Sequence, residues 1–163
     1  KPSSTDDMFE KAAEVAKQEG LVKDGDLVII VAGVPVGESG TTNVMKLQII
    51  GNKLAQGLGV GNGSVVGKAV VANSAEEANS KVKEGDILVA KTTDPDYMPA
   101  IKKASGLVVE ASGLTSHAAV VGLSLGIPVV VGTTDATEKI SDGSTITVDA
   151  RRGAIYQGEI SNL

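Results

Sequence analysis

The chain has 163 residues, 42% of them hydrophobic and only 2% aromatic, so its core must be built from aliphatic side chains. Its net charge of −5 and its scattered basic residues argue against a nucleic acid partner, and the lack of cysteine excludes disulfides and thiolate metal sites. No apolar run approaches the roughly 20 residues of a membrane helix, and no secretory signal stands at the N-terminus. Together these features predict a cytoplasmic globular protein. The start at Lys1, directly before a helix-capping signal, predicts a piece of a longer protein.

A helix is predicted close to the N-terminus. Ser4-Thr5-Asp6-Asp7 is typical of an N-cap followed by acidic residues in the first turn, where the helix dipole favours them. Gly20 predicts the end of this helix. Four apolar residues recur at helical spacing and predict its buried face: Met8, Ala12, Val15 and Ala16.

Two strands follow, separated by a loop. Leu27–Ala32 is a continuous apolar run of strand length, which is typical of a strand covered on both faces. Val44–Ile50 predicts the second strand. The loop between them, Gly33–Asn43, is rich in glycine and hydroxyl residues, so its N–H and O–H groups could donate to a phosphate. A plain connection between two strands is the alternative interpretation.

The composition then changes. Gly51–Gly63 contains five glycines, which predicts a linker or an irregular connection. A second unit of alternating strands and helices follows. A capping box of Ser74 and Glu77 predicts the start of its first helix. The other elements are expected as strands at Val65–Ala72, Asp86–Ala90, Leu107–Glu110 and Val129–Val131, helices at Tyr97–Ala104 and His117–Leu125, and a closing hairpin of Thr145–Val148 and Ala154–Gln157. This pattern predicts an α/β sandwich.

His117 is the only histidine and lies where a predicted strand ends and a predicted helix begins. Unpaired N–H groups and the positive end of the helix dipole favour a neutral imidazole there, and they would stabilise a phosphate carried on the ring. Thr115 and Ser116 add hydroxyl donors, so these three residues are the candidate catalytic set, with His117 as the phospho-acceptor. The alternative is that His117 only caps the helix or forms a hydrogen bond in a turn.

The sequence around His117 resembles a known signature. Gly113–Val121 followed by Leu125–Gly132 is similar to the phosphohistidine swivelling domain of phosphoenolpyruvate-utilising enzymes, and the similarity extends over about 100 residues. The resemblance implies a compact β/β/α sandwich that moves as a body and carries phosphate on the histidine. We therefore expect residues 64–163 to fold as this mobile domain.

Two positions depart from that family pattern. Ser112 stands where a second glycine is usual, and Leu123, after the small residue Gly122, stands where an arginine is usual. A cation lost beside a phosphate weakens its binding by about 1–3 kcal/mol. The departures favour a structural or regulatory role for the domain over phosphoryl transfer on His117.

The first 50 residues resemble a second family. Ser4–Met8 and Gly25–Asn43 are similar to the end of the C-terminal α/β domain of pyruvate kinases, some of which carry a phosphoenolpyruvate-utilising-type domain after it. The order here is the same. The resemblance therefore implies residues 1–50 as the end of the allosteric α/β domain, 51–63 as a linker and 64–163 as the mobile domain.

That resemblance also implies a function for the longer protein. Pyruvate kinases transfer phosphate from phosphoenolpyruvate to ADP in glycolysis, with Mg and a monovalent cation such as K, usually as homotetramers. The catalytic barrel of the family is not part of these 163 residues, so the chain alone is not expected to be an enzyme. Its expected partners are the rest of the pyruvate kinase chain and neighbouring subunits, and its expected role is to tune allostery or subunit assembly.

The loop after the first strand would then border an effector site for a sugar phosphate or nucleotide. The candidate effector-loop residues are Gly33, Val34, Pro35, Gly37, Ser39, Gly40, Thr41 and Thr42. No metal site is predicted in the chain. The two carboxylates of Thr92–Asp96 could supply oxygen ligands, but they are more typical of a turn with a helix N-cap.

Overall fold

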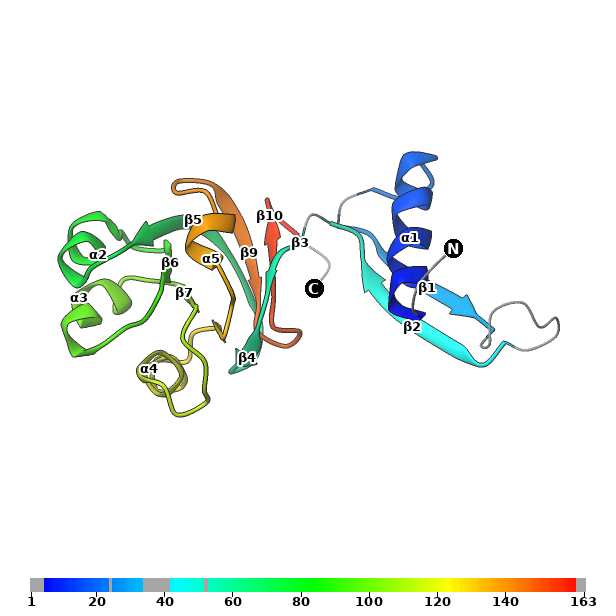
Figure 1. Ribbon diagram of the computed structural model, residues 1–163. Coiled ribbons are helices and arrows are strands. Elements are labelled where there is room, and N and C mark those ends of the chain that lie inside the picture. Colours follow the sequence, from blue (N-terminus) through cyan, green and yellow to red (C-terminus); the bar gives the residue numbers. More distant parts are fainter. Residues whose placement is uncertain (1–4, 24, 34–41, 52, 161–163) are drawn as a thin grey trace. The chain divides into compact units, whose positions relative to one another are not determined.

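The computed structural model describes residues 5–23, 25–33, 42–51 and 53–160 (Figure 1). The chain divides into two compact units, the first ending at Gly51 and the second beginning at the next residue. Each unit has its own buried residues. No helix within the described ranges is long and apolar enough to cross a membrane.

The described residues of the first unit form one helix and a two-stranded sheet. Helix α1 spans Thr5–Gln18, and strands β1 (Leu27–Ala32) and β2 (Val44–Ile49) pair antiparallel (Figure 1). The Lys46 ammonium on β2 lies 3.4 Å from Asp6 Oδ1 and 5.3 Å from the ring centre of Phe9. Helix α1 therefore contacts the β2 strand through its first two turns.

The predicted buried face of this helix is wrong by about one position. Phe9 and Ala13 are the buried residues of α1, whereas Val15 is exposed. Phe9 is the only phenylalanine of the chain and offers the most apolar area, so the helix turns that side toward the sheet. The predicted end is confirmed, because Gly20 has a φ of 69° and the N–H of Leu21 donates to Ala16. Ser4, expected in the N-cap, lies outside the described residues.

The prediction that Leu27–Ala32 is covered on both faces is also wrong for the described part of the chain. Leu27, Ile29 and Val31 are about half exposed. Register places Ile29 opposite Leu47 and Val31 opposite Met45, both of which are exposed as well. A two-stranded sheet with one helix on it has only one covered face, and these five residues form the other one. We call them the open sheet face.

The second unit is built on eight strands in the order β3-β10-β9-β5-β6-β7-β8-β4. Strand β5 joins two sheets: its first half pairs antiparallel with β9, and its second half pairs parallel with β6. Parallel pairing continues from β6 to β7 and β8, and every other pair is antiparallel. The strands are β3 (Lys53–Gln56), β4 (Leu58–Val60), β5 (Ser64–Ala72), β6 (Ile87–Ala90), β7 (Gly106–Val109), β8 (Val129–Val131), β9 (Thr145–Asp149) and β10 (Ala154–Gln157).

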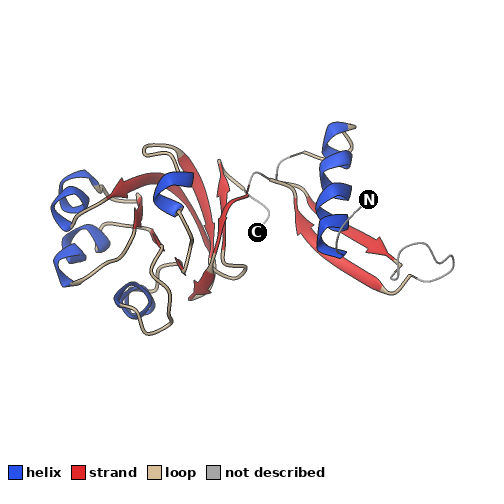
Figure 2. Cartoon of the chain, in the orientation of Figure 1, coloured by secondary structure: helices blue, strands red, loops and turns tan. Residues whose placement is uncertain are grey.

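Helices complete the layers, as Figure 2 shows in blue beside the red strands. Alternate residues of the central strands enter two separate cores. Leu88 and Leu107 pack toward the helices, whereas Ile87 and Val108 pack between the two sheets. The helices are α2 (Ala75–Lys81), the 3-10 turn η1 (Pro95–Tyr97), α3 (Met98–Ile101), α4 (His117–Leu125) and α5 (Ala136–Lys139). The expected β/β/α sandwich preceded by a partial α/β segment is confirmed, although α5 was not expected and Tyr97–Ala104 forms only the short η1–α3 pair.

The glycine-rich segment 51–63 is not a linker, which corrects the prediction. It supplies β3, which pairs with β10, and β4, which pairs with β8. A Cβ added at Gly57 would overlap the carbonyl oxygen of Val131, and one added at Gly59 would overlap that of Ala150. These glycines therefore allow close approach of backbones far apart in sequence.

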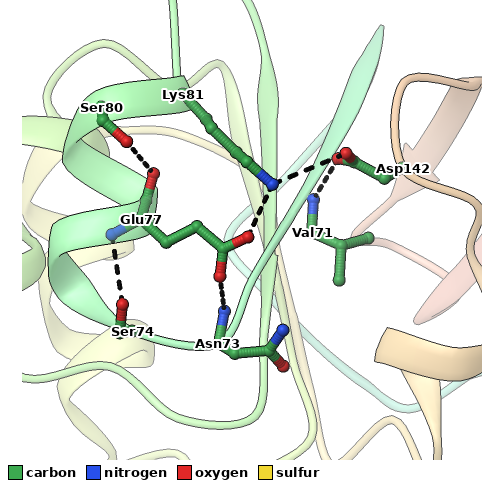
Figure 3. Close-up of polar contacts among 7 residues, drawn as sticks. All are labelled: Val71, Asn73, Ser74, Glu77, Ser80, Lys81 and Asp142. Carbon is green, nitrogen blue, oxygen red and sulfur yellow. Dashed lines mark hydrogen bonds and ion pairs between the residues drawn. The ribbon is translucent and has the colours of Figure 1, made fainter.

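The capping box before α2 is confirmed and belongs to a larger polar network (Figure 3). Ser74 Oγ accepts from the N–H of Glu77 at 3.2 Å, and Glu77 accepts from the N–H of Asn73 at 2.8 Å. Glu77 also lies 2.6 Å from the Lys81 ammonium, which is 3.8 Å from Asp142. Asp142 in turn accepts from the N–H of Val71 on β5 at 2.9 Å. The network thus joins α2 to β5 and to the turn before β9.

This network predicts a pH-dependent contribution to stability. The Lys81 hydrogen bond and the N–H of Asn73 hold the pKa of Glu77 below its usual value of 4.5. The ionised carboxylate therefore stabilises the fold at neutral pH, and this stabilisation is lost as the pH falls through the lowered pKa of the folded state. We expect Glu77→Gln to reduce the heat-unfolding midpoint at pH 7, and this effect to shrink as the pH falls through the lowered pKa of Glu77. Glu76→Gln, in the same turn but exposed, is the control; an equal effect of both variants at pH 7 would contradict this expectation.

Candidate functional site

The candidate site lies at the carboxyl ends of the parallel strands β6, β7 and β8. The loops that leave these strands run side by side: Ala111 N–H donates to Lys91, and Gly132 N–H donates to Ala111. Thr133 donates its hydroxyl to Val109 at 2.8 Å and is fully buried. Ligands of open α/β sheets are bound at this edge, because loops from several strands meet there.

His117 is the first residue of α4, as the sequence predicted, and the helix has the predicted bounds. Ser116 is its N-cap, with Oγ accepting from the N–H of Ala119 at 3.4 Å. Gly113 has a φ of 114°, which lets the loop turn so that Ser116 N–H donates to its carbonyl. The helix ends at Gly126, whose left-handed conformation is typical of a helix C-terminus.

A residue that the sequence did not single out for the site holds the histidine ring. Thr93 Oγ1 lies 3.0 Å from His117 Nδ1, and Thr93 is buried. Its neighbours behave as the turn interpretation expected, since Asp94 caps η1 by accepting from the N–H of Asp96. Thr93 follows β6, and His117 follows β7, so their shared edge of the parallel sheet was the available signal.

The Thr93 hydrogen bond determines what the ring can do. With Nδ1 engaged, His117 Nε2 is the ring atom without a hydrogen bond to any described residue, and the side chain is only partly buried. A ring held in this way presents one nitrogen to a reactant or to a partner surface. Which nitrogen carries the proton depends on whether the Thr93 hydroxyl donates or accepts.

We expect Thr93→Val to release this ring. The substitution removes the hydroxyl at nearly constant volume, so the preference for one tautomer should weaken by about 1 kcal/mol, the net worth of one hydrogen bond. Nitrogen-15 chemical shifts of the single histidine report the tautomer ratio directly. The exposed neighbour Thr92, changed to valine, is the control, and unchanged shifts in Thr93→Val would show that the hydrogen bond does not orient the ring.

The chain matches two protein families along its length. Residues 1–48 match the family described as "Pyruvate kinase, alpha/beta domain", and residues 82–153 match "PEP-utilising enzyme, mobile domain". Over its full length the chain is 85% identical to a pyruvate kinase of Lactobacillus delbrueckii subsp. bulgaricus, and over 99% of its length it is 56% identical to one of Geobacillus stearothermophilus. The chain is a C-terminal segment of the bacterial pyruvate kinase family. Both expected resemblances are thereby confirmed.

The match concerns part of a longer protein. The chain spans 28% of the Lactobacillus relative and 27% of the Geobacillus relative. Among solved structures, the holo-form of Thermococcus kodakaraensis aconitase X is similar to 67% of this chain and all of that one, with a TM-score of 0.51 and 18% identity. This last likeness shows a shared fold alone.

Leu123, which stands where an arginine is usual, and the small residue Gly122 before it have clear structural surroundings. A Cβ added at Gly122 would overlap Val129 Cγ2, so a glycine there lets α4 pack closely on β8. Leu123, at the position expected for arginine, is largely exposed and presents an apolar side chain. Thr115 is also exposed. The structure thus places Ser116 and His117 at the start of α4. The hydroxyl of Ser116 is already engaged in the helix cap.

Glu110 is the charged group at the end of β7. Its Oε1 accepts from the Thr137 hydroxyl at 2.6 Å and from the Thr137 N–H at 2.9 Å. Burial alone would raise the pKa of Glu110, but these hydrogen bonds and the Lys91 charge lower it below its usual value. Glu110 therefore fixes the start of α5 beside the site.

Other expected sites can be only partly placed. Of the effector-loop candidates, Gly33 and Thr42 are described, at the two ends of the loop where Asn43 N–H donates to Ala32. The other candidates, Val34, Pro35, Gly37, Ser39, Gly40 and Thr41, lie outside the described residues. Within the described ranges, no three Asp, Glu or His side chains are close enough to hold a metal ion.

Proposed function

We propose that this chain is the C-terminal regulatory and structural part of a pyruvate kinase, whose complete chain transfers phosphate from phosphoenolpyruvate to ADP with Mg and K. Residues 1–50 would be the end of its allosteric α/β domain, with the Gly33–Asn43 loop bordering a sugar-phosphate or nucleotide effector site. The second unit would tune the effector response or subunit assembly of a homotetramer.

The single observation that carries this proposal is the unbroken similarity to pyruvate kinases across both units. A second observation agrees with it. The open sheet face exposes five large apolar side chains, from Leu27 to Leu47, and few of the unit's described residues are buried. An apolar sheet face of this kind is stable when another layer covers it, and a longer α/β domain would supply that layer.

Regulatory use of the second unit is favoured over phosphoryl transfer by what surrounds His117. The ring has a hydroxyl partner in Thr93, but the outer side of α4 presents leucine and valine instead of cations. Transfer of a phosphoryl group depends on positive charge close to the phosphate oxygens. The residues of α4 supply none.

The test uses the complete parent protein with His117→Ala. We expect purified parent to convert phosphoenolpyruvate and ADP to pyruvate and ATP, and the variant to turn over at the same rate. With labelled phosphoenolpyruvate, we expect no acid-labile label on the peptide that contains His117. A parent without this activity would refute the proposed function. An acid-labile label on this peptide that His117→Ala abolishes would show instead that His117 carries phosphate.

A further inference from the structure

The short loop between β4 and β5 contains Asn62 followed by Gly63. Of the six asparagines in the chain, Asn62 is the one that precedes a glycine. Asparagine in this setting is chemically labile, because the following main-chain nitrogen can attack the side-chain amide carbon and a glycine has no Cβ to obstruct the approach. In a folded protein this reaction requires that the asparagine is exposed and that neither reacting group is held by a hydrogen bond.

The surroundings of Asn62 meet these requirements. Asn62 is exposed, and its side-chain amide has no hydrogen bond to a described residue. The N–H of Gly63 also donates to no described acceptor. A Cβ placed on Gly63 would have nothing within 4 Å, so there is open space on that side of the backbone. The main-chain nitrogen and the amide carbon are therefore free to meet.

Comparable positions elsewhere in the second unit are held by hydrogen bonds. Asp142 is also followed by a glycine, but its carboxylate accepts from the N–H of Val71 at 2.9 Å. The N–H of Gly143 donates to the carbonyl of Ala69 at 2.7 Å, so that nitrogen is engaged as well. Asn79 lies inside α2, and its side-chain amide is bonded at both its oxygen and its nitrogen. The β4–β5 loop thus combines the labile sequence with free reacting groups.

We propose that Asn62 is a site of spontaneous deamidation that yields aspartate and isoaspartate. The Gly63 nitrogen forms a bond to Asn62 Cγ, the Cγ–Nδ2 bond breaks, and ammonia leaves with the proton of the Gly63 N–H. Water then opens the five-membered imide. Attack of water at Cγ gives aspartate. Attack at the main-chain carbonyl carbon gives isoaspartate, whose backbone runs through the side chain and is longer by one carbon.

Isoaspartate at this position changes the length of a join whose two ends are fixed. At one end β4 pairs with β8, and at the other end Gly63 accepts from the N–H of Ala150 at 3.0 Å. An extra backbone carbon between these two attachments, together with a new negative charge, loosens one of them. The modification therefore makes the order of β4 depend on the age of the protein.

The test follows the mass of one peptide as the complete protein ages at mildly alkaline pH. Cleavage by trypsin after Lys53 and Lys68 isolates residues 54–68, which contain Asn62 as their single asparagine. We expect this peptide to gain one mass unit with time, assigned by fragmentation to Asn62 and not to Gln56. We also expect it to become a methyl acceptor for an isoaspartyl carboxyl methyltransferase with labelled S-adenosylmethionine.

Two controls accompany this measurement. Asn62→Gln can cyclise only to a less favourable six-membered imide, so its peptide should gain neither mass nor label. The peptide 69–81, which carries Asn73 and Asn79, should change more slowly than 54–68 in the wild type. Hydrogen exchange of the β4 backbone should be faster in aged wild type than in aged Asn62→Gln, because the modified loop no longer holds the strand.

Three outcomes would overturn the inference. The 54–68 peptide could stay unmodified in the complete protein while the same peptide, once isolated, reacts; the fold would then protect Asn62. Equal rates for the peptides 54–68 and 69–81 would show that the loop is not a preferred site. Equal hydrogen exchange of β4 in aged wild type and aged Asn62→Gln would show that isoaspartate does not disturb the strand.

Discussion

Replacing Gly59 with alanine is expected to lower the free energy of unfolding of the second unit by about 3 kcal/mol, the upper end for overpacking. The added Cβ would overlap the backbone carbonyl of Ala150, which cannot rotate away as a side chain could. Strand β4 would have to leave β8, and Val60 would leave the core between the sheet and helices α2–α4. A segment that served only as a flexible linker would tolerate the same change at almost no cost.

Tyrosine fluorescence during urea unfolding measures this effect for the second unit alone. The chain has two tyrosines and no tryptophan, and both Tyr97 and Tyr156 are buried in that unit. Leu58→Ala, the neighbour in the same strand with an exposed side chain, is the control and should cost about 0.5 kcal/mol or less. A Gly59→Ala variant as stable as this control would contradict the close packing of β4.

Leu88→Ala should lower the free energy of unfolding by a similar or greater amount, about 2–5 kcal/mol. Leu88 is fully buried on β6 and packs in the helix-side core between the sheet and α2–α4. The dense surroundings of a central parallel strand cannot collapse into the space that the side chain leaves. Val66→Ala on the exposed side of β5 is the control, and the same fluorescence measurement applies. A loss below about 1 kcal/mol for Leu88→Ala would show that the helix layer is loosely packed.

The elements that the sequence predicted correctly are those with local signals. Helix α4 begins and ends as expected because Ser116 supplies a cap and Gly126 a left-handed terminus. Strands β6 and β8 were expected because short apolar runs suit strands buried on both faces. In each case the residues that decide the structure lie within the element or directly beside it.

The errors came from contacts between distant segments. Leu27–Ala32 and Ile87–Ala90 are both apolar, yet the first has an open face and the second is fully buried, because cover is supplied by other elements. At Gly57 and Gly59 the sequence could not distinguish flexibility from close approach, since the neighbours Val131 and Ala150 are more than 70 positions away. Thr93 was not assigned to the site because three elements, η1, α3 and β7, separate it in sequence from its partner His117.

The most direct test of a regulatory second unit is truncation of the parent protein after Gly51, where the two units divide. This boundary keeps β3 and β4 together with the rest of their sheet, which a cut at residue 64 would not. Steady-state kinetics across phosphoenolpyruvate and effector concentrations, with heat inactivation of the same samples, should show turnover retained but effector response, cooperativity or heat stability clearly changed. Identical effector response, cooperativity and heat stability in the truncated and complete proteins would contradict the proposed role.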